Sequence, residues 1–459
     1  MATAEQPEAK WRPARLISAY GIKGETEQEQ RATSALLAVM GAVPDFGRAI
    51  VNWLGAPAGR VSAYTEVRFD EDEGEAGHIP DGALLVQRGK TRWTCLVEVK
   101  TGGNSLAKDQ IESYLRIARS HGMNGLLTIS NDIVSDASEL PISVDKKSLK
   151  GLTVRHLSWW RILTMAIEQK EHHGIDDPEQ AWILGELISY LQDERSGASG
   201  FMGMGEHWVK VREGARNMTL RPADPAVRDI AERWEQFVEY ICLDLRQSLG
   251  RSVSAVWPRN TDRAARVAAG SKTIAQDGTM AASIKVPDAA APIDLGVNLR
   301  TRQFTTSTEI DAPKDVRAIT RINWLLRQAK DMPPGLRVEA RYPNVREPVA
   351  MLLEDARKHP ERLLYAADPK REPRSFRLTL ANELGLKRDA SQGSFLSASR
   401  QQLKDFYREV LQAIRAWQPS APRLPVPDRG DGSTPPIGLE PESGSEEALT
   451  TSDLADPTS

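Results

Sequence analysis

Cysteine is almost missing from this chain of 459 residues, which contains only Cys95 and Cys242. Two cysteines exclude a disulfide framework and a cysteine-rich metal site, so a reducing cytoplasm is the expected compartment. No apolar run is long enough to cross a bilayer, and the opening stretch MATAEQPEAKWRPARL has no apolar signal core. We therefore expect no membrane partner.

Several common catalytic signatures are also missing. The chain has no P-loop, no glycine-rich dinucleotide fingerprint and no Gly-x-Ser-x-Gly elbow. The formal net charge is only −3, which by itself argues neither for nor against a nucleic-acid partner. With 40% hydrophobic and 27% charged residues, the composition is that of a globular protein.

The length of the chain predicts two or three domains. The glycine-rich stretch SGASGFMGMG at 196–205 is the best boundary, and the end of the chain is rich in proline, serine, glycine and acids. Strand-like and helical segments over 250–417 suggest a separate α+β domain. We expect a flexible arm at 1–23 and an α/β domain at 24–195, followed by a linker at 196–223. A helix and an α+β domain are expected at 224–418, and a disordered acidic tail at 419–459.

Capping signals predict where several helices begin. Thr26 and Glu29 have the spacing of a capping box, which predicts a helix start in GETEQEQRATSALLAVM. A long helix is expected at about 224–249, with Gly250 after its end. Further N-caps are expected at Ser105, Ser158, Asp177 and Asp224.

The most informative stretch is IPDGALLVQRGKTRWTCLVEVKTG at 79–102, where two apolar runs flank the short break RGKT. Gly89 and Lys90 suit the two-residue loop of a hairpin, with glycine in the first position of a type II′ turn. In that register Arg88 lies opposite Thr91, and Asp81 lies opposite Glu98. The two carboxylates would then have Cβ atoms ~5 Å apart.

Like charges placed opposite each other destabilise a sheet unless something compensates them. A hard divalent cation with oxygen ligands, Mg²⁺ or Mn²⁺, is the natural candidate. Strand alternation places Lys100 on the same face as Glu98, where it can orient a metal-bound water or neutralise developing charge. The alternative is a surface hairpin with a Glu–Lys pair, but the apolar flanks ALLV and CLVEV argue against a hydrated face.

The next predicted helix, SLAKDQIESYLRIARSHG, follows this strand after a short loop. Gln110 and Tyr114 are four residues apart and share one face of that helix. Since a loop from a strand end to a helix start commonly faces a ligand, this face is expected at the site. The alternative is that Tyr114 packs in the core and Gln110 is solvated.

The motifs PD at 80–81, EVK at 98–100 and QIESY at 110–114 together resemble the PD-(D/E)XK nuclease superfamily. The Gln-x-x-x-Tyr element is similar to that of the RecB-type branch. The resemblance covers about the first third of the chain. It implies a restriction-endonuclease-like fold, in which a mixed sheet is flanked by helices in the order helix, three antiparallel-linked strands, helix, strand.

The resemblance also implies roles for individual residues. Asp81 and Glu98 would bind Mg²⁺ or Mn²⁺, Lys100 would be the catalytic lysine, and Gln110 and Tyr114 would contact substrate or support the site. The family often carries a glutamate on its first helix, for which Glu29 is a candidate. The alternatives are Glu25, or a role for Glu29 as the capping partner of Thr26.

The leading hypothesis from the sequence is therefore a metal-dependent nuclease that hydrolyses phosphodiester bonds, with DNA as the expected substrate. The C-terminal domain would sense, target or oligomerise, and the architecture resembles bacterial defence against foreign DNA. A non-catalytic module that binds nucleic acid or a protein partner is the alternative, and a stress regulator is a weaker one. The sequence does not choose between end-directed and internal cleavage.

Overall fold

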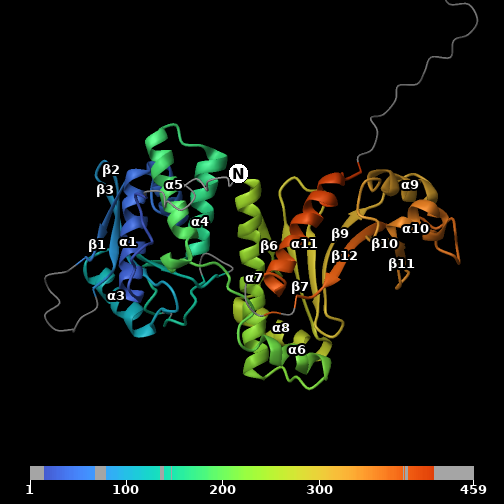
Figure 1. The fold of residues 1–459 in the computed structure, drawn as a ribbon, viewed down its shortest axis with the longest axis horizontal. Coiled ribbons are helices and arrows are strands. Elements are labelled where there is room, and N and C mark those ends of the chain that lie inside the picture. The colour runs from blue at the N-terminus through green and yellow to red at the C-terminus, as the bar shows by residue number, and fades with distance from the viewer. Residues whose placement is uncertain are drawn as a thin grey trace, which may run out of the picture. The chain divides into compact units, whose positions relative to one another are not determined.

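A five-stranded sheet forms the centre of the N-terminal half of the protein, in a computed structural model that describes residues 15–67, 79–134, 139–145, 147–385, 387 and 391–417. The order β1-β2-β3-β4-β5 follows the chain, and the sheet is antiparallel from β1 to β3 and parallel from β3 to β5 (Figure 1). The strands are β1 (Arg60–Thr65), β2 (Gly82–Arg88), β3 (Thr91–Val99), β4 (Gly125–Ser130) and β5 (Thr153–Ser158).

Helices cover both faces of this sheet. One apolar cluster lies under α1 (Glu25–Ala42), α2 (Pro44–Trp53), α4 (Trp159–Ile167) and α5 (Pro178–Gln192), and the other lies under α3 (Lys108–Ser120). Cys95, Val97 and Val99 of β3 face the first cluster, whereas Leu96 faces the second. The strand β3 is therefore buried on both faces over its second half. The expected mixed α/β class is confirmed.

The predicted hairpin register is confirmed between β2 and β3. Gly82 pairs with Val97, and Arg88 pairs with Thr91 at the other end. Gly89 has a φ of 57° in the two-residue loop, as the first position of a type II′ turn requires. The register extends to Asp81, which directly precedes β2, and to Glu98 near the end of β3.

Three of the predicted N-caps are confirmed. Ser158, Asp177 and Asp224 each accept a hydrogen bond from a main-chain N–H in the first turn of the helix that follows. The long helix α7 (Pro225–Leu249) ends as expected at Gly250, which has a φ of 61°.

Two expected N-terminal caps are wrong, although both helices form. α1 begins at Glu25 after Gly24, which has no side chain to cap it, and at this end Glu27 accepts a hydrogen bond of 2.9 Å from Lys23 N. α3 begins at Lys108 rather than after Ser105, since Leu106 is buried in the apolar cluster beneath the helix and Ala107 is extended.

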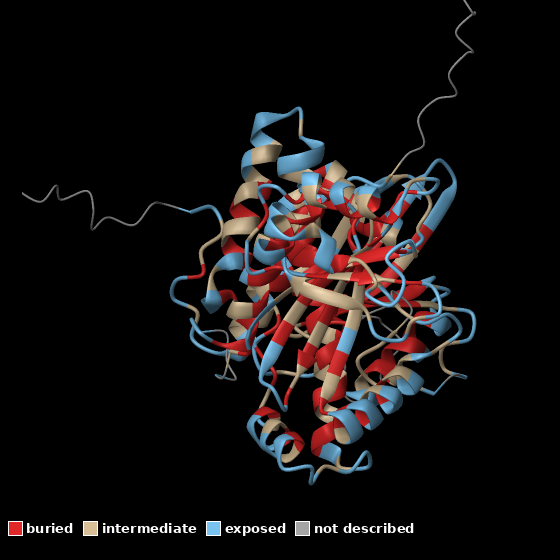
Figure 2. Cartoon of the chain, turned by 90° about the vertical axis from the view of Figure 1, so that its right-hand side faces the viewer, coloured by how far each residue is buried: buried red, intermediate tan, exposed pale blue. Residues whose placement is uncertain are grey.

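The C-terminal half contains a seven-stranded antiparallel sheet in the order β11-β10-β12-β9-β8-β7-β6. Its core includes the aromatic contact of Phe237 on α7 with Phe395, whose ring centroids are 4.8 Å apart. Buried residues concentrate along the strands and on the inner sides of the helices (Figure 2). The elements are α6 (Trp208–Arg216), α7, β6 (Ser254–Val256), α8 (Arg263–Asp277), β7 (Thr279–Lys285), β8 (Ile293–Asn298), β9 (Gln303–Asp311), α9 (Ala318–Gln328), β10 (Arg337–Arg341), β11 (Val349–Leu352), α10 (Leu353–Lys358), β12 (Ser375–Glu383) and α11 (Phe395–Glu409).

Residues 196–223, expected to form a linker, contain the helix α6. Met204 and Trp208 of this segment are fully buried, and the Trp208 ring lies 5.2 Å from that of Phe395. The segment is thus part of the C-terminal core.

Within the expected arm, Arg15 pairs with Glu186 at 2.9 Å. Residues 1–14, the acidic loop at 70–78 and the predicted tail at 419–459 lie outside the described residues.

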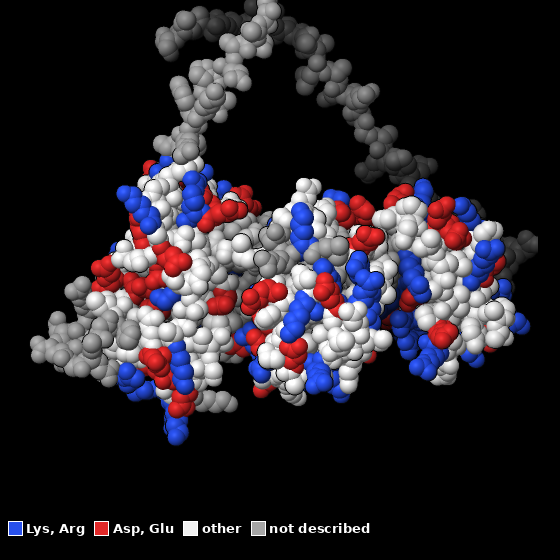
Figure 3. All heavy atoms as spheres, turned by 60° about the horizontal axis from the view of Figure 1, so that its bottom comes forward, with Lys and Arg blue, Asp and Glu red and all other residues white. Residues whose placement is uncertain are grey.

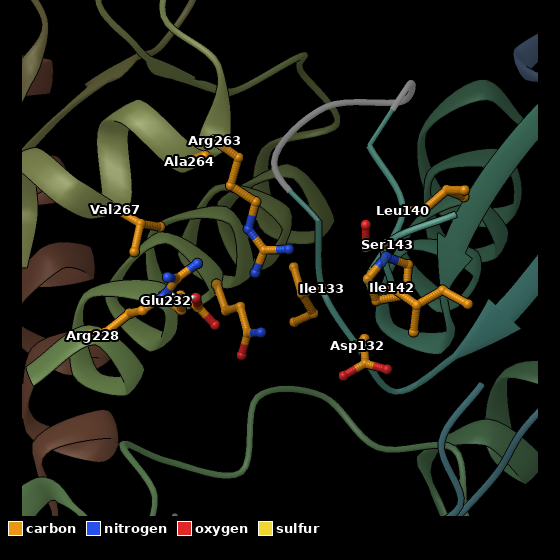
Figure 4. A pocket seen from close by; sticks show the side chains of 12 residues that line it. Asp132, Ile133, Leu140, Ile142, Ser143, Arg228, Glu232, Arg263, Ala264 and Val267 are labelled. Atoms are coloured by element: carbon orange, nitrogen blue, oxygen red, sulfur yellow. Dashed lines mark hydrogen bonds and ion pairs between the residues drawn. The ribbon is translucent and has the colours of Figure 1, made fainter. Parts of the chain in front are cut away.

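The two halves meet mainly where α4 packs against α7. Arg161 pairs with Glu239, and Glu168 receives two hydrogen bonds of 2.9 Å from Arg246. The Trp160 and Tyr240 rings stack at 4.9 Å. Near the start of α7, a cavity separates Arg228, Arg263 and Val267 of α7 and α8 from Asp132, Ile142 and Ser143 (Figure 4).

None of the described helices is, taken singly, long and apolar enough to span a membrane. The helices α1 and α2, which are bent by 108° where they meet, reach that length and composition only when counted together.

His156 on β5 gives the fold a predicted dependence on pH. Its Nδ1 lies 3.0 Å from Thr128 Oγ1 and its Nε2 lies 2.9 Å from the Asp132 carbonyl oxygen, and burial lowers its pKa to about 4. The folded state favours the neutral ring, so the contribution of His156 to the free energy of unfolding is complete above pH ~6.5. As the pH falls from 6.5 towards 4, protonation of the unfolded chain lowers the free energy of unfolding by roughly 3 kcal/mol. We expect the melting temperature of wild type to fall faster than that of His156→Gln over this range.

The matched control is His121→Gln, because His121 is exposed. Melting curves of the three proteins between pH 7 and 4 measure the difference. Parallel pH profiles for wild type and His156→Gln would contradict the assignment.

Candidate active site

The end of β3 brings the predicted acidic residues together. Asp81 directly precedes β2, Glu98 lies on β3, and Lys100 follows the last residue of that strand. Asp81 is fixed by the main chain of the neighbouring strand, since its Oδ2 accepts a hydrogen bond of 2.7 Å from Val99 N. The hairpin register therefore places both carboxylates at one end of the sheet.

Glu98 is fully buried, and neither of its carboxylate oxygens has a hydrogen-bond partner among the described residues. Lys100 Nζ lies 2.6 Å from Glu98 Oε1, which is an ion-pair contact rather than a well-directed hydrogen bond. Burial, together with the nearby charge of Asp81, raises the pKa of Glu98 to about 8. Burial also raises the pKa of Asp81.

Glu29 comes to the site from α1. Its Oε1 accepts a hydrogen bond of 3.1 Å from Lys100 Nζ, so the capping role with Thr26 is replaced by a contact with the site. Burial alone would lower the pKa of Lys100, but the carboxylates of Glu98 and Glu29 outweigh it and raise that pKa. The ammonium group is thus charged and is held between two carboxylates.

Gln110 and Tyr114 share one face of α3, as their spacing predicts. Gln110 Nε2 donates to Tyr114 Oη at 3.0 Å, and Tyr114 Oη donates to the Ile79 carbonyl oxygen at 3.1 Å. The Tyr114 ring is buried, and burial together with the charge of Glu98 raises the pKa of its hydroxyl. Tyr114 therefore supports the segment that leads into Asp81.

Two residues outside the predicted set also position the site. Trp159 Nε1 donates to the Lys100 carbonyl oxygen at 2.9 Å. Asn131 directly follows β4 and donates to the carbonyl oxygens of Gly102 and Gly197 at 3.0 and 2.9 Å. For Asn131, its position directly after the carboxyl end of a buried strand could have indicated a place at the site. For Trp159, the sequence pattern indicates only a residue packed in the core.

The donor set fits a hard divalent cation. Glu98 has buried oxygens without hydrogen bonds, and Asp81 adds a second carboxylate beside it. Across the described part of the chain, no group of three or more His, Cys, Asp or Glu side chains is arranged to hold a metal ion. A pair of carboxylates is nevertheless typical of Mg²⁺, which keeps several waters and takes its remaining ligands from substrate phosphates.

A scan against protein-family models and a search of the curated proteins found no match for this chain. The chemistry of the site therefore has to be argued from its own geometry.

Glu98→Gln tests whether the carboxylates form a cation site. The change replaces a buried acid, whose pKa is raised by burial and by the nearby charge of Asp81, with a neutral amide of similar size, so the melting temperature in EDTA should stay level or rise. In wild type, Mn²⁺ at 100 times its Kd should stabilise the fold by about 2.7 kcal/mol. That stabilisation should be absent in the variant.

Glu179→Gln on the exposed start of α5 is the matched control and should retain the full Mn²⁺ response. Melting curves with and without Mn²⁺ provide the measurement. An equal response in all three proteins would place the cation elsewhere.

Proposed function

We propose that this protein is a metal-dependent nuclease whose N-terminal domain has the restriction-endonuclease-like fold of the PD-(D/E)XK superfamily. The observation that carries the proposal is the convergence of Asp81, Glu98 and Lys100 at the end of β3, with Glu98 fully buried and its Oε1 2.6 Å from Lys100 Nζ. The element order α1, α2, β1 to β3, α3, β4 supports it, because apart from the additional helix α2 it matches the order implied by the resemblance.

In this proposal Asp81 and Glu98 hold Mg²⁺ or Mn²⁺. The bound ion would lower the pKa of a water ligand and neutralise charge on the scissile phosphate. Lys100 lies beside Glu98 and carries a positive charge, so it is placed to orient the attacking water and to stabilise the negative charge that develops on the phosphate. Glu29 positions Lys100 from the other side.

The proposed substrate is DNA, cut internally or from its ends. On the face drawn in Figure 3, Lys and Arg are interspersed with Asp and Glu, so nucleic-acid binding would depend on local contacts rather than on a one-sign surface. The proposal includes a role of the C-terminal domain in sensing, targeting or oligomerisation. It also includes binding of a protein partner, a cytoplasmic location and a function in bacterial defence against foreign DNA.

The test is cleavage of plasmid, linear and single-stranded DNA and of RNA in Mg²⁺, Mn²⁺ or EDTA. We expect metal-dependent cutting by wild type and a loss of at least about 100-fold in Asp81→Asn and in Lys100→Met, since each removes a group acting on the reacting phosphate. Asp45→Asn on the surface of α2 is the control and should cut at the wild-type rate.

Retention of metal-dependent cutting in Asp81→Asn would refute the site assignment. If wild type binds Mn²⁺ through Glu98 but cuts none of the substrates, the nuclease proposal fails for the isolated chain. The same protein mixed with cell extract would then show whether a partner activates it, and continued inactivity would favour a binding module.

A further inference from the structure

A cleft of about 490 Å³ in the C-terminal half lies at one end of the seven-stranded sheet, where β9 ends at Asp311 and β12 begins at Ser375. The nuclease site does not include it. Its charged lining consists of the four bases Lys314, Arg321, Arg371 and Arg374 and the two acids Asp311 and Glu372. We call this feature the basic cleft, because the excess of positive charge in a hollow surface attracts anions.

Arg321 on α9 is buried and holds the walls of the basic cleft together. Its Nε donates to the Val316 carbonyl oxygen at 2.9 Å, and its Nη1 donates to the Pro373 carbonyl oxygen at 3.2 Å. The same guanidinium pairs with Glu372. One side chain thus ties the segment before α9 to the segment before β12 and neutralises one of the two acids. Asp311 is then the remaining acid of the lining, against three bases.

The main chain fixes the same end of the sheet. Ala312 N donates to the Arg374 carbonyl oxygen at 2.9 Å, and Arg374 N donates to the Arg341 carbonyl oxygen at 2.7 Å. These bonds join the end of β9, the start of β12 and the end of β10, which are neighbours in the sheet. The basic cleft is therefore built on fixed backbone.

Lys314 and Arg374 carry the charge that is available to a ligand. Both side chains are exposed, and neither has an ion pair or a side-chain hydrogen bond within the described part of the chain. Arg371 is held only by a contact of 3.8 Å with Asp368 and by the Tyr365 ring, whose centroid lies 5.3 Å away. The three bases thus leave most of their donors free for oxygen atoms of a ligand.

We propose that the basic cleft binds phosphate groups of a nucleic-acid backbone, as a second contact with the substrate of the nuclease. The inference rests on the proposed function for the choice of nucleic acid. Lys314 and Arg374 are exposed rather than enclosed, which suits a chain of phosphates that lies along the surface better than a small anion surrounded by protein. Contacts of this kind add affinity and position the strand without reading its sequence.

Lys314→Gln and Lys272→Gln form a matched pair of variants. Both lysines are exposed in the C-terminal half, but only Lys314 lines the basic cleft. Loss of one phosphate contact should reduce the slope of log K against log salt by about 0.9 and weaken duplex binding about threefold to tenfold at about 100 mM salt. Lys272→Gln should leave both quantities unchanged. Arg374→Gln and Arg251→Gln repeat the comparison for exposed arginines inside and outside the cleft.

The experiment is fluorescence anisotropy of a short labelled DNA duplex titrated with the full chain in EDTA, over a series of salt concentrations. EDTA prevents metal-dependent cutting, so binding is measured alone. Melting curves check that each variant is folded. The proposal is overturned if wild type does not bind the duplex, or if Lys314→Gln and Lys272→Gln have the same affinity and the same salt slope.

Calorimetric titration with inorganic pyrophosphate separates a strand from a small free anion. If Lys314→Gln weakens the binding of pyrophosphate but not that of the duplex, the ligand is a free anion and the proposal is overturned. The outcome for the nuclease is read separately. Weaker duplex binding in the cleft variants, without metal-dependent cutting by wild type, supports the basic cleft and counts against the nuclease. Cutting by wild type together with unchanged binding in the cleft variants has the opposite meaning.

Discussion

The strand β3 is covered by apolar clusters on both faces, and the arrangement of the candidate site depends on this constraint. Val97 and Val99 face one cluster and Leu96 faces the other, so any residue late in the strand is withdrawn from water. Glu98 occupies such a position and is fully buried. A carboxylate there is costly unless it is protonated, paired or bound to a cation. Its raised pKa is the direct consequence.

The charge at this point is only partly balanced. Asp81, Glu98 and Glu29 bring three carboxylates to a single ammonium group, that of Lys100. Main-chain and indole N–H groups hold the geometry rather than neutralise it, since Val99 N binds Asp81 and Trp159 Nε1 binds the carbonyl oxygen of Lys100. This excess of carboxyl groups over ammonium groups is the basis for the divalent cation in the proposed function.

Ion pairs link the N-terminal half to the C-terminal half. Glu168 and Arg246 join α4 to α7 at the main contact. On α8, Arg266 pairs with Glu235 of α7 and with Glu139 of the N-terminal half at 3.0 Å. Arg266 thus connects α7 and α8 to a segment of the N-terminal half.

The sequence by itself determined the hairpin that creates the candidate site. A glycine in the loop and alternating apolar runs specify the register, because a slip of one residue would move every side chain to the other face. The caps at Ser158, Asp177 and Asp224 were predictable for a similar reason, since each uses only the first turn of its own helix.

Only the tertiary structure decided the features that depend on packing between distant segments. Glu29 had the spacing of a capping partner, but Lys100, 71 positions away, binds its carboxylate instead. Residues 196–223 have the composition of a linker, yet Met204 and Trp208 are buried because the C-terminal core accepts them. Local patterns predict contacts within one helix or hairpin, whereas burial against a remote element adds free energy that no local pattern contains.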